Sequence, residues 1–201
     1  LFDGANLDAA RRTVGMAIAV TLACMVLAFP LAYFMARHAR GWTKALLYIA
    51  VMLPLWSSYL VRLYAWKLLL AREGAISWAA QQLHLTWLLD AVLATPLVGG
   101  PSLSFSTLGT FIVFVYMWLP FMVLPVMAAI ERIPQSTLEA SADLGAGPAT
   151  TLRQVILPLA RPALAVTALF AFMTAWNEFI LAATLMGDER AYTLPVVLNG
   201  Y

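Results

Sequence analysis

The side chains able to do chemistry are few in this sequence and stand far apart. The chain has two histidines, His38 and His84, and one cysteine, Cys24. None has a partner at the spacing of a metal site or of a nucleophile with its base. The sequence also lacks a phosphate-binding loop of the GxxxxGK[S/T] type. We therefore expect no catalytic centre, metal site or cofactor in this chain, and we expect any ATP hydrolysis to use a loop on another chain.

One acidic residue, Glu178, and its neighbour Asn177 interrupt the otherwise apolar stretch 163–187. A carboxylate inside a membrane costs about 2.5–3.5 kcal/mol on insertion scales, so it should face protein or water. Glu178 would pair with Arg62 or be hydrated near the membrane surface; alternatively, all three residues would line a path for a polar solute. A carboxylate would suit a cationic polyamine, whereas an amide beside a carboxylate would suit sugar hydroxyls.

The most informative polar stretch is 131–162, which has six charged residues and no apolar run long enough to span a membrane. Ser136 and Glu139 have the spacing of a capping box, which predicts that a short helix begins near Ser136. This helix should end at Gly145 or Gly147, because glycine can adopt the left-handed conformation found after helix ends.

A second short helix is predicted after the first. Pro148 suits the first turn of a helix, and Pro158 should end it. The two short helices would form a compact helix–turn–helix outside the membrane, which is a shape suited to binding a partner.

The elements that position these residues follow from composition. The 201 residues are 63% hydrophobic and 11% charged, against about 45–50% and 25% in soluble domains. A folded domain of this size leaves about a third of its surface exposed, so much of this chain should lie in lipid. A soluble enzyme, a nucleic-acid-binding domain and a disordered tail are all disfavoured, and a net charge of +2 indicates no nucleic-acid partner.

The apolar runs predict an all-α integral membrane protein. We expect four transmembrane helices, at about 13–36, 45–68, 107–130 and 163–187. The loop from Arg37 to Lys44 has three Lys or Arg residues and no acid, which places it in the cytoplasm. The alternation of sides then makes 131–162 cytoplasmic and 69–106 external. Within 69–106 we expect an interfacial helix at about 76–89 followed by a loop, with a re-entrant segment as the alternative.

Four points of the cytoplasmic stretch match a known pattern. Glu139-Ala140-Ser141 is followed after three residues by Gly145, and after nine more by Val155-Ile156-Leu157-Pro158. This resembles the EAA loop, EAA-x3-G-x9-I-x-LP, of permease subunits in binding-protein-dependent ABC importers. Ser141 and Val155 depart conservatively from the pattern. Residues 10–165 resemble the spermidine/putrescine-type permeases, whereas the stretches from Ala175 and Tyr192 look more like sugar-type permeases.

The resemblance implies a type I importer permease fold with about six spans. Residues 1–201 would form one transmembrane domain that lacks its first and last helices. The loop would dock on a cytoplasmic ATPase subunit that carries magnesium-ATP. The residues implied in this coupling are Glu139, Ala140, Ser141, Asp143, Gly145, Leu157 and Pro158.

The same resemblance implies the other partners and the location. The chain would lie in the bacterial inner membrane and pair with a second permease subunit, as a homodimer or a heterodimer. It would receive a small solute from an external binding protein. Three alternatives stay open: an ion-driven transporter with Glu178 as the ion site, a membrane enzyme, and a scaffold or signalling subunit.

Overall fold

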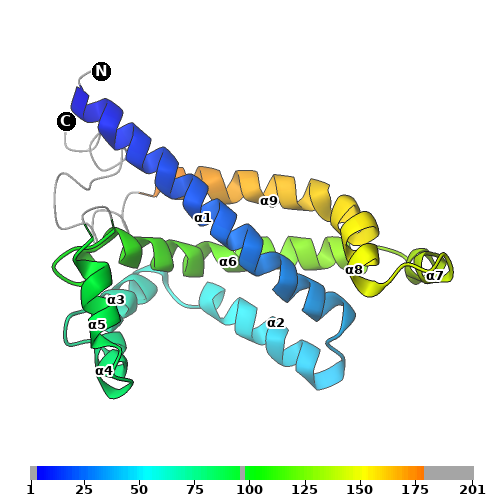
Figure 1. The fold of residues 1–201 in the computed structure, drawn as a ribbon, viewed down its shortest axis with the longest axis horizontal. Coiled ribbons are helices and arrows are strands. Elements are labelled where there is room, and N and C mark those ends of the chain that lie inside the picture. Colours follow the sequence, from blue (N-terminus) through cyan, green and yellow to red (C-terminus); the bar gives the residue numbers. More distant parts are fainter. Residues whose placement is uncertain (1–3, 96–97, 179–201) are drawn as a thin grey trace. The chain divides into compact units, whose positions relative to one another are not determined.

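The computed structural model describes residues 4–95 and 98–178, and every regular element in these ranges is helical (Figure 1). Of residues 4–9 only the backbone is described. The predicted all-α class is therefore confirmed. The elements are α1 (Gly4–Arg37), α2 (Gly41–Trp56), α3 (Tyr59–Leu69), α4 (Ala75–Gln82), α5 (Thr86–Leu93), η1 (Leu103–Phe105), α6 (Thr107–Glu131), α7 (Gln135–Asp143), α8 (Pro148–Thr151), η2 (Leu152–Ile156) and α9 (Leu157–Asn177).

Within the described ranges, three helical stretches are long and apolar enough to cross a membrane, and a fourth crossing arises if α2 and α3 count as one broken span. The three stretches are Ala10–Arg37, Thr107–Glu131 and Pro148–Asn177. The third of these begins before the predicted span 163–187, and residues 179–187 lie outside the described part of the chain.

The span predicted over 45–68 is not one continuous helix. It is interrupted at Ser57 and Ser58, and Ser58 has extended backbone angles (φ −57°, ψ 140°). Two causes act together at this break. Pro54 removes one backbone hydrogen bond near the end of α2, and serine side chains compete with the helix for backbone groups.

The described residues fall into two compact units, and the chain passes between them within α1, at the end of α2, and within α6 and α9. The described part of the first unit comprises 4–20, 56–95, 98–117 and 173–178, and the second unit comprises 21–55 and 118–172. Each unit is described separately below.

In the first unit, the predicted interfacial helix at 76–89 is two helices, α4 and α5. They are separated at Leu83–Leu85, where His84 has a positive φ of 54°. The segment between α5 and α6 is held by serine side chains, because Ser106 Oγ accepts the Gly109 N–H at 2.9 Å and so caps α6. A Cβ at Gly109 would lie 1.8 Å from the Leu103 carbonyl oxygen, so only glycine fits there.

A cavity of about 420 Å³ lies among α4, α5 and the segment before α6. Its polar lining includes Arg72, Ser77, Gln81, Asp90 and Ser102. Elsewhere in the same unit, aromatic and cationic groups tie α3 to its neighbours. Trp66 packs edge-on against Tyr116 of α6 with ring centroids 5.0 Å apart, and Lys67 Nζ lies 5.4 Å from the centre of the Phe105 ring.

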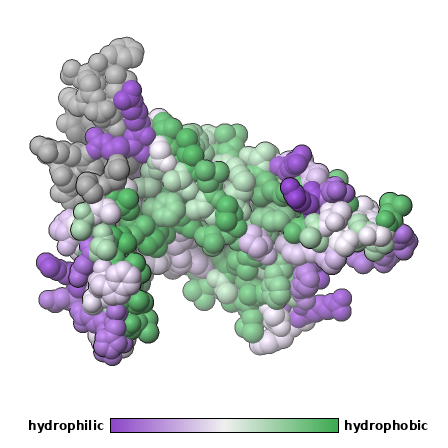
Figure 2. Space-filling model, viewed as in Figure 1, coloured by the Kyte–Doolittle hydropathy of each residue, from purple (hydrophilic) through white to green (hydrophobic). Residues whose placement is uncertain are grey.

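The second unit buries alanine, valine, isoleucine and methionine side chains where its long helices pack, and it leaves many other large apolar side chains exposed. Ala28 and Ala32 of α1 are fully buried, whereas Val26 on the same helix is 71% exposed. Exposed leucine and valine on a long helix are expected where lipid replaces water as the solvent. Figure 2 shows apolar residues covering the long helices and hydrophilic residues gathered around the α1–α2 turn and the α7–α8 region.

Candidate functional site

The predicted helix–turn–helix is present in part. The short helix α7, the turn after it and α8 form what we call the α7–α8 hairpin, but α8 is not a separate short helix, because it continues into α9 as one helical stretch, Pro148–Asn177. The hairpin lies beyond the end of α6 (Figure 1). After α7, Gly145 has a φ of +80°. Its N–H donates to the Ala142 carbonyl at 2.8 Å, and the Ala146 N–H donates to the Ser141 carbonyl at 3.1 Å. These two bonds form a Schellman motif, so the predicted role of Gly145 in ending the helix is confirmed.

The capping box predicted at Ser136 and Glu139 is wrong. The N-cap of α7 is Pro134, which makes no side-chain cap bond; its carbonyl accepts the Thr137 N–H at 3.1 Å. Because the Pro134 carbonyl already accepts a hydrogen bond from the first turn, α7 begins at Gln135, one residue before the predicted start near Ser136. Ser136 is therefore already inside α7, and both Ser136 and Glu139 are exposed.

The α7–α8 hairpin has an inner side and an outer side. Ser141 is the buried residue of α7, and its Oγ lies 3.0 Å from Thr151 Oγ1 of α8. This hydrogen bond joins the two short helices. Glu139, Ala140 and Asp143 are exposed, and Leu144, the C-cap of α7, is 88% exposed. The hairpin thus presents carboxylates and an apolar side chain outward from a hydrogen-bonded base.

Pro148 occupies the first turn of α8, as predicted, but Pro158 does not end the second helix. Residues Leu152–Ile156 form a π-helical turn that runs directly into α9, so Pro158 lies in the first turn of the long helix. A proline lacks the N–H that an α-helix needs and clashes with the carbonyl four residues earlier. A wider π-turn just before Pro158 relieves that conflict. Leu157 and Pro158 are both half-buried at this junction.

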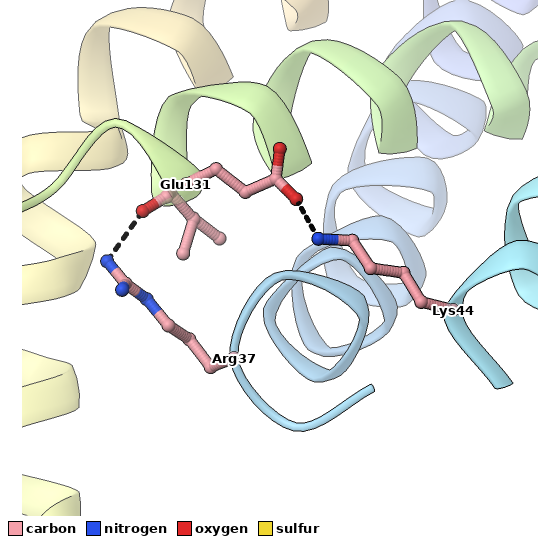
Figure 3. A network of polar contacts seen from close by, with 4 residues as sticks. Arg37, Lys44 and Glu131 are labelled. Atoms are coloured by element: carbon pink, nitrogen blue, oxygen red, sulfur yellow. Dashed lines mark hydrogen bonds and ion pairs between the residues drawn. The ribbon is translucent and has the colours of Figure 1, made fainter. Parts of the chain in front are cut away.

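The base of the α7–α8 hairpin carries a polar network that sequence reasoning missed (Figure 3). Arg37, the last residue of α1, uses its Nη2 to donate to the Ile130 carbonyl at 2.7 Å and to the Ile133 carbonyl at 2.9 Å. Lys44 of α2 forms an ion pair with Glu131 at 2.6 Å. The signal available in the sequence is the cluster of basic residues at 37–44, whose charge alone indicates only the membrane side.

The predicted translocation residues lie in the first unit. The Tyr59 hydroxyl of α3 donates to Glu178 Oε1, and Asn177 Nδ2 donates to the Met173 carbonyl at 2.8 Å. Arg62, one turn after Tyr59, has a buried Nε for which the described structure gives no hydrogen-bond partner. The carboxylate is thus held by a tyrosine that sequence analysis did not assign to it.

Among the described residues, no group of three or more His, Cys, Asp or Glu side chains could hold a metal ion.

Comparison with known proteins places this geometry in context. The chain is 55% identical over 181 residues to the inner membrane ABC transporter permease protein YdcU of Escherichia coli K12, covering 90% of this chain and 58% of that protein. It is 32% identical over 190 residues to the spermidine/putrescine transport system permease protein PotB of the same organism, covering 94% of this chain and 64% of PotB. The chain therefore spans about three fifths of the length of these relatives.

A solved structure has the same fold. It is a bacterial ABC transporter involved in the import of the acidic polysaccharide alginate, matched with a TM-score of 0.67 and 20% identity over 100% of this chain and 60% of that one. Residues 28–201 match the family described as "Binding-protein-dependent transport system inner membrane component". The chain thus belongs to the family of inner membrane permease components of binding-protein-dependent ABC transport systems.

Proposed function

We propose that the chain is the membrane-spanning part of an ATP-driven importer and that the α7–α8 hairpin couples it to a separate ATPase subunit. The observation that carries the proposal is the hairpin itself. It follows one candidate span, leads into another, and exposes Glu139, Asp143 and Leu144. A rigid hairpin that exposes an apolar side chain beside carboxylates is better suited to binding in a groove of a partner protein than to exposure to solvent.

Each of the predicted coupling residues has a distinct part in this proposal. Glu139, Ala140 and Asp143 would touch the ATPase subunit, since all three are exposed. Ser141 would fix the spacing of the two short helices through its bond to Thr151. Gly145 would set the turn between the short helices.

Leu157 and Pro158 have a different part, because they follow the π-turn at the start of α9. A rotation of the α7–α8 hairpin would reach α9 through this junction. Magnesium-ATP would be bound and hydrolysed by the partner, which would drive the spans between inward-open and outward-open arrangements.

The remaining partners are a second permease subunit, as a homodimer or heterodimer, and an external binding protein that delivers a small solute. We favour a polyamine-like cation over a sugar. The relatives include a spermidine/putrescine permease, and Glu178 supplies a carboxylate near the end of the described part of α9. Asn177, Glu178 and Arg62 would line the path, with Tyr59 holding the carboxylate.

The experiment that tests this proposal uses the full-length protein, its genomic-neighbour ATPase and its binding protein in proteoliposomes. We expect ATP hydrolysis to rise when spermidine-loaded binding protein is added, and we expect less or no rise with a disaccharide. Glu139→Arg should abolish the increase in ATP hydrolysis that the loaded binding protein causes, because the substitution reverses an exposed charge at the proposed contact. Uptake that follows an ion gradient without ATP would instead support a secondary transporter.

A second measurement separates cargo recognition from coupling. Glu178→Gln keeps the shape of the side chain and removes its charge. If Glu178 lines the path for a cation, this variant should lower spermidine uptake while leaving assembly with the ATPase subunit unchanged. Unchanged uptake in a well-expressed Glu178→Gln protein would remove Glu178 from the path.

A further inference from the structure

The link between α6 and α7 is short and is held from outside by one side chain. Arg37 Nη2 donates to two carbonyls, that of Ile130 in the last turn of α6 and that of Ile133 just before Pro134, the N-cap of α7. The last four carbonyls of a helix have no partner within it, and a cation there also complements the helix dipole. Arg37 therefore closes the end of α6 and grips the entry to the α7–α8 hairpin at the same time.

A second contact of different chemistry lies beside the first. Lys44 in the first turns of α2 pairs with Glu131, the last residue of α6, at 2.6 Å, and the two side chains are 39% and 36% exposed. The α1–α2 turn is thus fastened to residues 130–133 at two points, one on each side of the turn (Figure 3). Because Ile130 and Ile133 are themselves buried, this link has little freedom to move independently.

Stability alone gives a weak reason for this arrangement. Arg37 is partly buried, and its Nε is buried without a hydrogen-bond partner in the described structure. A buried cation with an unsatisfied donor gains little over a well-packed apolar residue. An arginine, unlike an apolar residue, can donate directional hydrogen bonds to two carbonyls at once. Here these bonds hold the link between a spanning helix and the α7–α8 hairpin.

We propose that Arg37, Lys44 and Glu131 form a bracket that passes motion of the α7–α8 hairpin to α1 and α2. Without the bracket, hairpin motion would reach only the two helices that the hairpin is covalently joined to, α6 and α9. With it, the same displacement pulls on the ends of α1 and α2 through hydrogen bonds and an ion pair. These are positioning residues, and the inference rests on the proposed coupling to an ATPase subunit.

The test measures the solute transported per ATP hydrolysed, using the full-length permease, its ATPase and its binding protein in proteoliposomes, with spermidine as the probe. Arg37→Gln should lower this ratio by about fivefold or more while the ATPase subunit still co-purifies. Arg37→Lys should lower it less, because an ammonium keeps the charge and loses the planar fork. Arg40→Gln is the matched control, since Arg40 is exposed and lies in the same turn, and it should match wild type.

The ion pair supplies a version of the test that does not depend on a partly buried residue. Lys44→Glu and Glu131→Lys should each lower the ratio by about two- to threefold, and the double exchange should restore it. The double exchange therefore still tests the bracket if the Arg37→Gln variant fails to assemble. A ratio unchanged in all these variants, or single-variant losses that the double exchange does not restore, would overturn the bracket. If wild type itself shows no ATP-driven transport, the proposed function fails and the bracket fails with it.

Discussion

Two short helices in this chain, α4 and α7, are built alike and face different surroundings. They have eight and nine residues, and each buries a single serine, Ser77 in α4 and Ser141 in α7. Each ends at a leucine C-cap followed by a residue of positive φ, which is His84 after α4 and Gly145 after α7. After α4 the Leu85 N–H donates to the Ala80 carbonyl at 2.8 Å, so both ends are Schellman motifs.

The difference lies in what surrounds each helix. The neighbours of α4 are other parts of its own segment, since it packs with α3 and α5 and lines a cavity of about 420 Å³. The α7–α8 hairpin exposes most of both its helices, including the 88% exposed Leu144, whereas α4 exposes half of its residues. The same local structure therefore serves two different purposes. In α4 it folds a segment onto itself, and in α7 we propose that it holds a surface for a partner.

The largest effect should come from placing a charge on the two C-cap leucines. Leu144→Asp should weaken binding of the ATPase subunit by about 30-fold or more, because a charge would replace an apolar anchor at the contact. Leu83→Asp, at the equivalent position after α4 and 67% exposed, should leave that binding unchanged. The measurement is co-purification of the ATPase subunit with each full-length variant. Equal losses in both variants would erase the proposed difference between the helices.

The next effect should come from the residues of positive φ. Gly145→Ala should destabilise the end of α7 by about 1 kcal/mol or more, because alanine is strained at φ +80°. Nothing lies within 4 Å of the added Cβ, so the cost is conformational and not a clash. His84→Gly should stabilise the end of α4 by up to about 1 kcal/mol. Amide hydrogen exchange of residues 80–86 and 141–147 reports each end separately, and shifts of the same sign would contradict this expectation.

A smaller effect should distinguish the two buried serines. Ser141→Ala removes the bond that joins α7 to α8 and should cost about 1 kcal/mol. Ser77→Ala should cost less, about 0.5 kcal/mol. The Ser77 bond to the Ala71 carbonyl is longer, at 3.2 Å, and that carbonyl also accepts the Gly74 N–H. Thermal unfolding of the detergent-solubilised protein would show the order, and a larger loss for Ser77→Ala would reverse it.

The smallest effect is expected at Ser136. Because α7 is capped at Pro134 and Ser136 makes no capping bond, Ser136→Ala should change stability by less than about 0.5 kcal/mol. A loss near 1 kcal/mol would restore the capping box that the spacing of Ser136 and Glu139 had predicted. The same hydrogen-exchange measurement over residues 134–139 provides the readout.

Local chemistry made part of the fold predictable. The left-handed turn at Gly145 and the first-turn position of Pro148 follow from backbone sterics alone, and both were predicted correctly. The capping box at Ser136 and the helix end at Pro158 were predicted wrongly for a related reason. Each lies where a neighbouring element decides the outcome, so that Pro134 starts α7 early and a π-turn lets α9 include Pro158.

The rest of the candidate site depends on contacts between residues distant in sequence. Arg37 meets Ile130 and Ile133 across separations of 93 and 96 residues, and Tyr59 meets Glu178 across 119. No spacing rule reports such pairs, because they exist only after the long helices have packed. The family motif located the surface of the α7–α8 hairpin, and the fold was needed to locate what holds the base of that hairpin in place.

Site-directed crosslinking tests the central claim most directly. Leu144→Cys and Leu83→Cys would each be placed in a Cys24→Ser background of the full-length protein, so that the maleimide cannot label Cys24. Each variant would be labelled with a photoreactive maleimide and assembled with the ATPase subunit. We predict a crosslink to the ATPase subunit from position 144 and none from position 83. A crosslink from position 83, or from neither position in an assembled complex, would contradict the account.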